Sequence, residues 1–161
     1  MTKLKIIIIA AVSENNVIGK DGSIPWYSKE EITHFKQTTN NYPILMGRKT
    51  FASLKSPLSN RTNLILSRDS KFGIIDENVF TFRSIGDVYD FSKNNNFTKL
   101  FVIGGGEIYS QLINKADELL LSRMPFIVDG DTYFPEIDTG IWKLRSKKDF
   151  KSFTLEKYVR N

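Results

Sequence analysis

One feature constrains the fold of this chain most: short apolar runs alternate with helical patterns over its first two thirds. The run at 6–12 is continuously aliphatic, which is typical of a strand covered on both faces. Strands are predicted at 6–12, 43–46, 63–67, 79–82 and 99–103, and helices at 28–38, 48–54, 84–93 and 107–114. This alternation predicts a doubly wound α/β fold with a mostly parallel central sheet and helices on both faces.

The last third of the chain follows a different pattern. Strands are predicted at 118–124, 142–147 and 153–159, and no helical pattern separates the last two. These two strands are expected to form an antiparallel hairpin at one edge of a sheet of about eight strands. A chain of 161 residues without a linker-like segment is expected to be a single domain covering 1–161.

Composition excludes several classes of site. The chain has no cysteine, which excludes disulfides, thiolate zinc sites, iron–sulfur clusters and a cysteine nucleophile. Its one histidine, His34, is too little for a multi-histidine metal site and argues against a Ser-His-Asp triad. No metal is therefore expected. His34 itself is expected on the outer or boundary face of its helix, without a functional role.

Hydropathy and charge bear on location and partners. The longest apolar run near the start is far shorter than the ~20 residues needed to span a bilayer, and no signal-peptide cleavage pattern follows it. A cytoplasmic protein without membrane contacts is therefore expected. The formal net charge is +5, which suits an anionic ligand such as a nucleotide. Because the basic residues are scattered, no nucleic-acid partner is expected.

The loops after the predicted strands are the expected place for chemistry, because open parallel sheets bind ligands beyond the carboxyl ends of their strands. The glycines at 104–106 follow one strand and precede a helix, which suits a pyrophosphate group; a flexible turn is an equal alternative. The segment 48–50 (Arg-Lys-Thr) follows a second strand, and Ser67-Arg68 follows a third. Together they predict one phosphate-bearing ligand across three strand ends, with solvated loop charges as the alternative.

The segment before the first helix and the start of that helix carry two further signals. The long segment 13–28 has apolar content that includes a tryptophan, which predicts a lid over a site. Ser28 and Glu31 have the spacing of a capping box, a purely structural role. Alternatively, Ile32 and Phe35 face the interior and Glu31 borders an apolar cleft, where burial raises its pKa. The pattern alone leaves both interpretations open.

Taken together, these motifs resemble those of the dihydrofolate reductases. The similarity covers essentially the whole chain, and it depends on the order and spacing of the motifs rather than on any one of them. The matching segments are Ala10-Ala11, Val17-Ile18-Gly19, Pro25-Trp26, Glu31, Phe35-Lys36, Met46-Gly47-Arg48-Lys49-Thr50, Pro57-Leu58 with Arg61, Ile65-Leu66-Ser67-Arg68, Ile103-Gly104-Gly105-Gly106-Glu107-Ile108-Tyr109 and Gly130-Asp131-Thr132-Tyr133-Phe134-Pro135.

The resemblance implies the reduction of 7,8-dihydrofolate to 5,6,7,8-tetrahydrofolate, a step of one-carbon metabolism, by hydride transfer from NADPH. It makes Glu31 the one ionisable group of the pterin pocket, where it promotes protonation by a water molecule. Arg61 is implied to hold the carboxylate of the substrate's glutamate tail. The implied partners are dihydrofolate, folate and antifolates such as methotrexate, and the implied oligomeric state is a monomer.

Three sets of site residues follow from the resemblance. At the catalytic centre it implies Glu31, Trp26 and Ser122. Around the substrate it implies Ile9, Ala11, Glu31, Ile32, Phe35, Leu54, Leu58, Arg61, Ile103, Tyr109 and Ser122. Around NADPH it implies Ala11, Ile18, Gly19, Gly47, Arg48, Lys49, Thr50, Ser67, Arg68, Ile103, Gly104, Gly105, Gly106, Glu107, Ile108 and Tyr109. It also implies a cis peptide bond between Gly104 and Gly105.

Three residues depart from the more usual pattern of the family. Glu31 stands where many bacterial members have aspartate, and its longer side chain is expected to weaken the binding of trimethoprim-like diaminopyrimidines. Ile24 stands where a methionine or leucine often packs against nicotinamide. Glu107 replaces a cation of some relatives, which weakens the expected preference for NADPH over NADH, although the cations at 48, 49 and 68 still favour the additional phosphate.

Two other functions fit parts of the sequence. A pyrimidine reductase of riboflavin synthesis has a similar architecture and uses NADPH, but Glu31 with Arg61 and the Pro25-Trp26 pair disfavour it. A catalytically silent module that binds nucleotides or nucleic acid fits the net charge and the glycine turn. Loss of NADPH absorbance on adding dihydrofolate distinguishes the enzyme from such a module.

Overall fold

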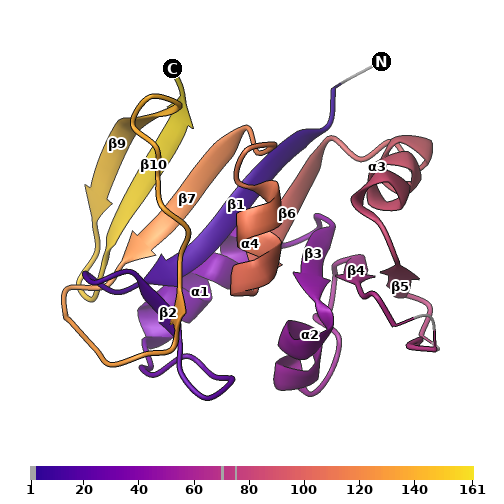
Figure 1. Cartoon of the computed structure of the whole chain (residues 1–161), viewed down its shortest axis with the longest axis horizontal. Coiled ribbons are helices and arrows are strands. Elements are labelled where there is room, and N and C mark those ends of the chain that lie inside the picture. The colour runs from indigo at the N-terminus through magenta and orange to yellow at the C-terminus, as the bar shows by residue number, and fades with distance from the viewer. Residues whose placement is uncertain (1–2, 70, 75) are drawn as a thin grey trace.

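The computed structural model describes residues 3–69, 71–74 and 76–161 of the chain. Within these residues, one sheet is formed by β1 (Lys5–Val12), β3 (Ile44–Gly47), β4 (Asn63–Leu66), β5 (Val79–Phe82), β6 (Lys99–Gly104), β7 (Glu118–Arg123), β9 (Trp142–Asp149) and β10 (Thr154–Arg160). The order across the sheet is β5-β4-β3-β6-β1-β7-β10-β9 (Figure 1). Every neighbouring pair from β5 to β7 is parallel, whereas β10 is antiparallel to both β7 and β9. The predicted mostly parallel sheet with a C-terminal hairpin is confirmed.

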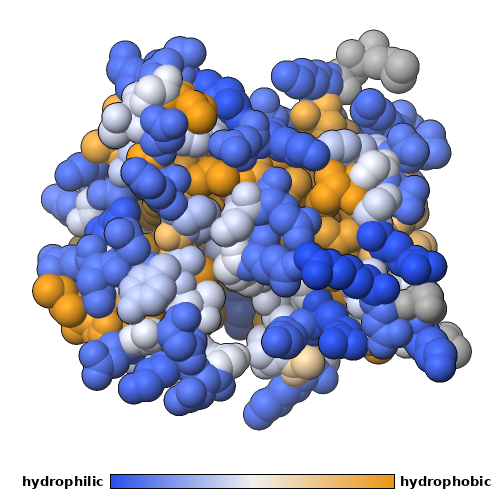
Figure 2. Space-filling view, in the orientation of Figure 1, coloured by the Kyte–Doolittle hydropathy of each residue, from blue (hydrophilic) through white to orange (hydrophobic). Residues whose placement is uncertain are grey.

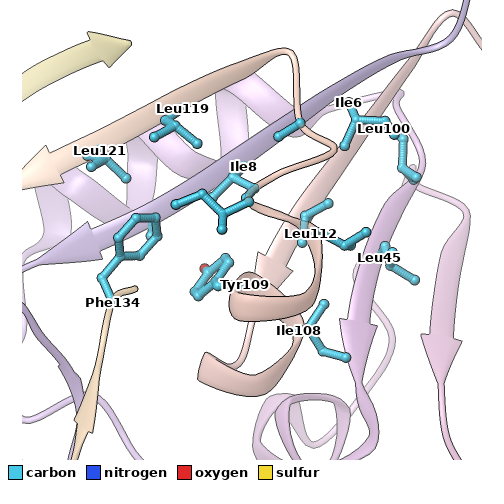
Figure 3. Close-up of a cluster of buried hydrophobic side chains, with 14 of the residues drawn as sticks. Ile6, Ile8, Leu45, Leu100, Ile108, Tyr109, Leu112, Leu119, Leu121 and Phe134 are labelled. Carbon is cyan, nitrogen blue, oxygen red and sulfur yellow. The ribbon is translucent and has the colours of Figure 1, made fainter. Parts of the chain in front are cut away.

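Helices cover both faces of this sheet, as predicted. They are α1 (Lys29–Thr39), α2 (Arg48–Leu54), α3 (Ile85–Asn94) and α4 (Gly106–Leu112). Successive side chains of a strand point to opposite faces, so β1 supplies two cores. Ile6 and Ile8 belong to the core that contains Leu112 of α4, which Figure 3 shows. Ile7 and Ile9 belong to the other core, against which Phe35 of α1 packs.

A potential ligand-binding site lies where two of the connections between strands leave the sheet on opposite faces. From β1 the chain crosses through α1 to β3, and from β6 it crosses through α4 to β7. The side-chain clusters place α1 and α4 on opposite faces of the sheet. The two crossovers therefore separate beyond the carboxyl ends of β1 and β6, which is where open α/β sheets bind their ligands.

Nothing in the local sequence pattern predicts a second, small sheet. It consists of β2 (Val17–Gly19) and β8 (Thr132–Tyr133), which pair antiparallel. Strands this short carry no periodic signal, and their partners are far apart in the chain. The segment 13–28, expected as a lid loop, is therefore partly regular, since β2 and a bridge between Lys20 and Ser23 lie within it.

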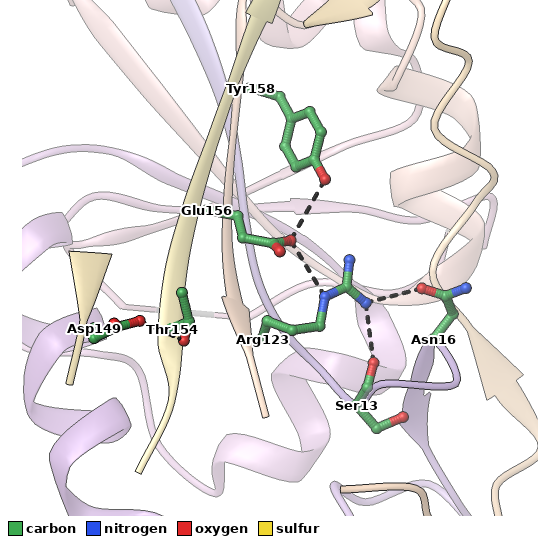
Figure 4. Close-up of polar contacts among 7 residues, drawn as sticks. All are labelled: Ser13, Asn16, Arg123, Asp149, Thr154, Glu156 and Tyr158. Atoms are coloured by element: carbon green, nitrogen blue, oxygen red, sulfur yellow. Dashed lines mark hydrogen bonds and ion pairs between the residues drawn. The ribbon is translucent and has the colours of Figure 1, made fainter. Parts of the chain in front are cut away.

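Arg123, at the end of β7, fastens the start of this segment to the sheet (Figure 4). Its Nη1 donates to the Ser13 carbonyl at 3.0 Å and to Asn16 Oδ1 at 2.9 Å. Its Nε donates to the Glu156 carboxylate of β10 at 3.2 Å. Ile24, further along the segment, is 57% exposed. The start of the segment is therefore anchored, whereas its middle, around Ile24, is exposed. None of the helices in the described part of the chain has the length and apolar character that crossing a membrane requires.

Candidate active site

A cleft of about 1100 Å³ opens beyond the carboxyl ends of β1, β3, β4 and β6. Its two ends differ in character. The apolar end lies beside α1 and α2 and is lined by Ile9, Ile32, Phe35, Leu54, Leu58 and Ile103 together with Glu31. The charged end lies at the starts of α2 and α4 and is lined by Arg48, Lys49, Arg68, Asp69, Arg83 and Glu107. In Figure 2, strongly hydrophilic side chains gather beside α4, over the ends of β3 and β4.

Glu31 satisfies both of the interpretations that the sequence leaves open. Ser28 is the N-cap of α1, and its Oγ accepts a hydrogen bond from the Glu31 backbone N–H at 3.1 Å. The Glu31 carboxylate makes no return bond to Ser28 within the described residues; it lines the cleft instead. Burial raises the pKa of the Glu31 carboxyl. Half of the capping box is therefore present, and the carboxyl is left free for chemistry.

Ser122 of β7 lies beneath this carboxyl. Its side chain is fully buried, and its Oγ has no hydrogen-bond partner of normal geometry among the described residues. The hydroxyl partly offsets the effect of burial, because it lowers the pKa of Glu31. The Ser122 hydroxyl is therefore placed to donate to the Glu31 carboxylate or to a ligand bound at the same point.

Tyr109 of α4 is fixed where the apolar and the charged end meet. Its hydroxyl donates to the Ile9 carbonyl at 2.7 Å. Burial and the nearby charge of Glu31 raise the pKa of the phenol, so it stays protonated. Gly104 lies against the Tyr109 ring with a φ of +126°, and a Cβ on it would lie 3.3 Å from the Tyr109 hydroxyl. The peptide bond between Gly104 and Gly105 is cis, as predicted.

The charged end contains two ion pairs that span neighbouring loops. Arg48 Nη1 lies 3.3 Å from the Asp69 carboxylate, and Arg68 is paired with Glu107 at the start of α4. Both members of the second pair are exposed, Arg68 by 85% and Glu107 by 67%. Lys49 lines the same end. This set of cations, with the hydroxyls of Thr50 and Ser67 also in the lining, fits the phosphates of a dinucleotide.

Comparison with known proteins identifies the family to which this site belongs. The sequence profile of the dihydrofolate reductases matches residues 5–160. The dihydrofolate reductase of Haemophilus influenzae is 37% identical over 153 residues, which cover 94% of this chain and 91% of that protein. Dihydrofolate reductase type 15 of Escherichia coli is 42% identical over 149 residues, 92% of either chain. This chain belongs to the dihydrofolate reductase family.

A solved structure agrees with the family assignment. Dihydrofolate reductase from Enterococcus faecalis, complexed with NADP(H) and RAB-propyl, matches with a TM-score of 0.85 at 30% identity, over 98% of this chain and 96% of that one. The family, the fold class, the enzyme class and NADPH as the cofactor, all expected from the sequence, are thereby confirmed. The family assignment disfavours the pyrimidine reductase of riboflavin synthesis, and the named enzymes among the relatives favour an enzyme over a silent binding module.

The cleft collects most of the residues expected around the substrate and all of those expected around NADPH. Those expected at the substrate that line it are Ile9, Ala11, Glu31, Ile32, Phe35, Leu54, Leu58, Ile103 and Tyr109. Those expected at NADPH that line it are Ala11, Ile18, Gly19, Gly47, Arg48, Lys49, Thr50, Ser67, Arg68, Ile103, Gly104, Gly105, Gly106, Glu107, Ile108 and Tyr109. Ser122, Arg61 and Trp26 lie outside this lining.

Arg61 is held beside the cleft by hydrogen bonds to its own chain. It is 9% exposed, its Nε donates to Thr39 Oγ1 at 3.0 Å, and its Nη2 donates to the Lys36 carbonyl at 2.8 Å. Its Nη1 donates to the Ser59 carbonyl. No carboxylate pairs with it among the described residues. A guanidinium has five N–H donors, so two remain for an anion.

Trp26 is half-buried and packs edge-on against Phe126, with ring centroids 5.6 Å apart. It therefore packs at the end of segment 13–28 and does not form part of the wall of the cleft.

Arg83 and Thr132 line the cleft, although the sequence did not predict them there. Arg83 could have been found, since Arg83-Ser84 follows β5 with the cation and hydroxyl that Ser67-Arg68 places after β4. The pairing of β2 with β8 brings Thr132 to the cleft, and no local sequence pattern predicts that pairing.

Proposed function

We propose that this chain reduces 7,8-dihydrofolate to 5,6,7,8-tetrahydrofolate with NADPH at the cleft described above. One observation carries the proposal: Glu31 is the one acidic side chain among the described residues at the apolar end, and burial raises its pKa. A carboxyl in such surroundings suits a flat ligand that has N–H donors along one edge and apolar faces, as a pterin has.

The residues of the apolar end have distinct roles in this reaction. Ile32, Phe35 and Leu54 contact the flat ring and exclude water from it. The Glu31 carboxylate accepts hydrogen bonds from the ring edge, and its charge raises the basicity of the ring nitrogen that gains a proton. Because Glu31 binds the other edge of the ring, a water molecule beneath segment 13–28 delivers that proton. Bound NADPH supplies the hydride.

The charged end would hold the cofactor. Arg48, Lys49 and Arg68 supply positive charge for its phosphates, and the hydroxyls of Thr50 and Ser67 supply hydrogen bonds. Arg61 would receive the carboxylate of the substrate's glutamate tail with the N–H groups that its own chain leaves free. A buried guanidinium without a counter-ion favours such an anion, because an unpaired buried charge is costly.

We also propose a low sensitivity to trimethoprim-like diaminopyrimidines. The side chain of Glu31 is one methylene longer than aspartate and carries its carboxylate further into the cleft. The substitution Glu31→Asp is expected to strengthen the binding of trimethoprim about fivefold, because the glutamate carboxylate of the parent enzyme is displaced from the best position for a charge-assisted hydrogen bond to the inhibitor. Inhibition constants of the two enzymes measure this change. An equal or weaker inhibition of the aspartate variant would contradict the proposal.

The chain would act as one functional domain, as a monomer in the cytoplasm. The continuous sheet supports the first point, because β1 near one end of the chain lies two strands from β10 at the other. Light scattering of the purified protein tests the second, and a mass of two chains at micromolar concentration would reject it.

Absorbance of NADPH tests the activity directly. Adding dihydrofolate to the enzyme and NADPH is expected to produce a continuous loss of the NADPH band, with tetrahydrofolate as the product by chromatography. Boiled enzyme and a reaction without dihydrofolate are the controls. No loss of absorbance from folded protein would refute the proposed reaction.

A further inference from the structure

The first turn of α1 is bound by a turn that lies 122 residues further along the chain. Glu30, the neighbour of Glu31, accepts two hydrogen bonds from Ser152 in the turn at 150–153 between β9 and β10. The backbone N–H of Ser152 donates to Glu30 Oε1 at 2.8 Å, and its Oγ donates to the same oxygen at 2.9 Å. The reaction described above makes no use of these contacts.

Hydrogen bonds through two serine hydroxyls connect this contact to the backbone of Glu31. Ser152 Oγ lies 2.7 Å from Ser28 Oγ. Because Ser152 has one hydroxyl proton and gives it to Glu30, Ser28 is the donor of the pair. Ser28 Oγ in turn accepts from the Glu31 backbone N–H at 3.1 Å. A continuous path of hydrogen bonds therefore runs from the turn at 150–153 to the N-cap and first turn of α1.

An apolar contact one helical turn further on reinforces the polar one. His34 lies four residues after Glu30, on the same side of α1. Its ring packs against Phe153 at 5.6 Å and Phe150 at 5.8 Å, and these two rings stack at 4.5 Å. His34 is thus at a boundary, as expected, but it has a packing partner. The turn at 150–153 holds α1 at two successive levels.

Each of the two titratable groups in this contact, Glu30 and His34, has a single protonation state at neutral pH. The hydrogen bonds from Ser152 and the nearby Lys151 hold the pKa of Glu30 below its usual value, so Glu30 is ionised. Burial and the charge of Lys148 lower the pKa of His34, so its ring is neutral. The bonds to Glu30 are therefore charge-assisted, and His34 can pack against aromatic rings without a buried charge.

Glu31 needs support from outside the cleft. Burial disfavours the ionised carboxylate at the apolar end, and the Ser122 hydroxyl offsets this effect only in part. A small outward rotation of the first turn of α1 would return the carboxyl to water. Contacts on the neighbouring face of the helix oppose that rotation, and among the described residues they include the contacts of Glu30, Ser28 and His34.

We propose that Glu30 and Ser152 are positioning residues of this enzyme: the turn at 150–153 holds the first turn of α1 so that the Glu31 carboxyl remains in the cleft. This inference deepens the function proposed above and depends on it for its kinetic consequence. It assigns to the edge hairpin, which lines no part of the cleft, a share in the placement of the ionisable group of the active site.

Two variants of Glu30 separate position from charge. Glu30→Ala removes the acceptor, whereas Glu30→Gln removes the charge and keeps an Oε1 for both bonds from Ser152. We expect Glu30→Ala to slow hydride transfer at neutral pH about fivefold, because small displacements of reacting groups are costly. We expect Glu30→Gln to stay within about twofold of the parent enzyme, since its carbonyl oxygen accepts the same bonds.

The titration of Glu31, followed by carbon NMR in the ligand-free protein, supplies a readout that does not depend on activity. Glu30→Ala is expected to bring the pKa of Glu31 closer to its ordinary value, as the carboxyl gains water, and Glu30→Gln to leave it nearly unchanged. Thr154→Ala is the matched control. It removes the bond from Thr154 Oγ1 to Asp149 at 3.0 Å in the same hairpin, at residues that Figure 4 shows, and removes no hydrogen bond to α1 among the described residues.

Each outcome decides between position and another cause. Equal effects of Glu30→Ala and Glu30→Gln would show that charge acts and would overturn the proposal. So would an unchanged rate and titration in Glu30→Ala, or an equal effect of Thr154→Ala. If the parent protein does not oxidise NADPH with dihydrofolate, the proposed reaction fails, while the titration of Glu31 still tests the role of Glu30.

Discussion

The two ends of the cleft use charge in opposite ways. At the apolar end one carboxyl, Glu31, is half-buried among aliphatic and aromatic side chains, and its pKa is raised. At the charged end several cations and acids lie in water, and Arg68 and Glu107 form an exposed pair. A buried charge interacts strongly and has no replacement, whereas exposed charges are screened and partly interchangeable. Substitutions should therefore have large effects at one end and small effects at the other.

Glu31→Gln is expected to have the largest effect. Without the carboxylate the ring nitrogen loses its electrostatic support, so hydride transfer at neutral pH should fall about a hundredfold. Activity should be partly recovered in acid, where the substrate is protonated by solvent. Rapid-mixing kinetics of hydride transfer against pH measure both effects. Unchanged turnover would show that Glu31 has no role in the mechanism, and would contradict the expectation that substitutions at the apolar end have the larger effects.

The same variant makes a prediction about stability. The pKa of Glu31 is raised in the folded chain above 4.5, so the carboxyl favours the folded state at low pH. That contribution is lost as the pH rises through the folded pKa. Glu31→Gln should therefore be more stable than the parent protein at neutral pH, and the difference should disappear in acid. Denaturant unfolding at several pH values measures the free energies.

Gly104→Ala is expected to have the next largest effect, because Gly104 lies where the two ends meet. Its φ of +126° is unfavourable for alanine, and the new Cβ would lie 3.3 Å from the Tyr109 hydroxyl. The free energy of unfolding should fall by about 2 kcal/mol. Gly73→Ala, where nothing lies within 4 Å of the new Cβ, is the matched control. Equal stability of the two variants would contradict this prediction.

Arg61→Ala tests the region next to the apolar end, outside the lining of the cleft. Loss of a buried guanidinium that binds a carboxylate should raise the KM for dihydrofolate about tenfold. A reducible pterin without the glutamate tail should show no such change. Arg145→Ala, on the exposed side of β9, controls for the loss of positive charge. Equal effects on substrates with and without the tail would show that Arg61 acts through the fold and not through that carboxylate.

Glu107→Gln is expected to have the smallest effect and tests the charged end. Glu107 competes with an incoming phosphate for Arg68, but exposed pairs contribute little, so NADPH should bind about threefold more tightly to the variant. NADH, which lacks the additional phosphate, should gain less. Fluorescence titrations of the two cofactors measure the change, with Glu77→Gln, an exposed acid outside the cleft, as the control. A tenfold or greater change would mean that the two ends do not differ as proposed.

Local patterns determined most of the fold and the broad plan of the site. The spacing of apolar residues reflects which faces of each helix and strand are buried. The parallel sheet, its helices and the C-terminal hairpin could therefore be predicted. The resemblance placed Glu31, the glycines at 104–106 and the cations at 48, 49 and 68 around one ligand, and the structure brings them to one cleft.

Tertiary structure decided which distant partners meet. The pairing of β2 with β8, the bond of Arg68 to Glu107 and the contact of Glu30 with Ser152 each join segments without a local signal. It also decided the direction of single side chains, since Trp26 packs on Phe126 and Arg61 on the end of α1. The physical reason is that periodicity records how deeply a residue is buried, whereas its partner depends on which segments the whole sheet brings together.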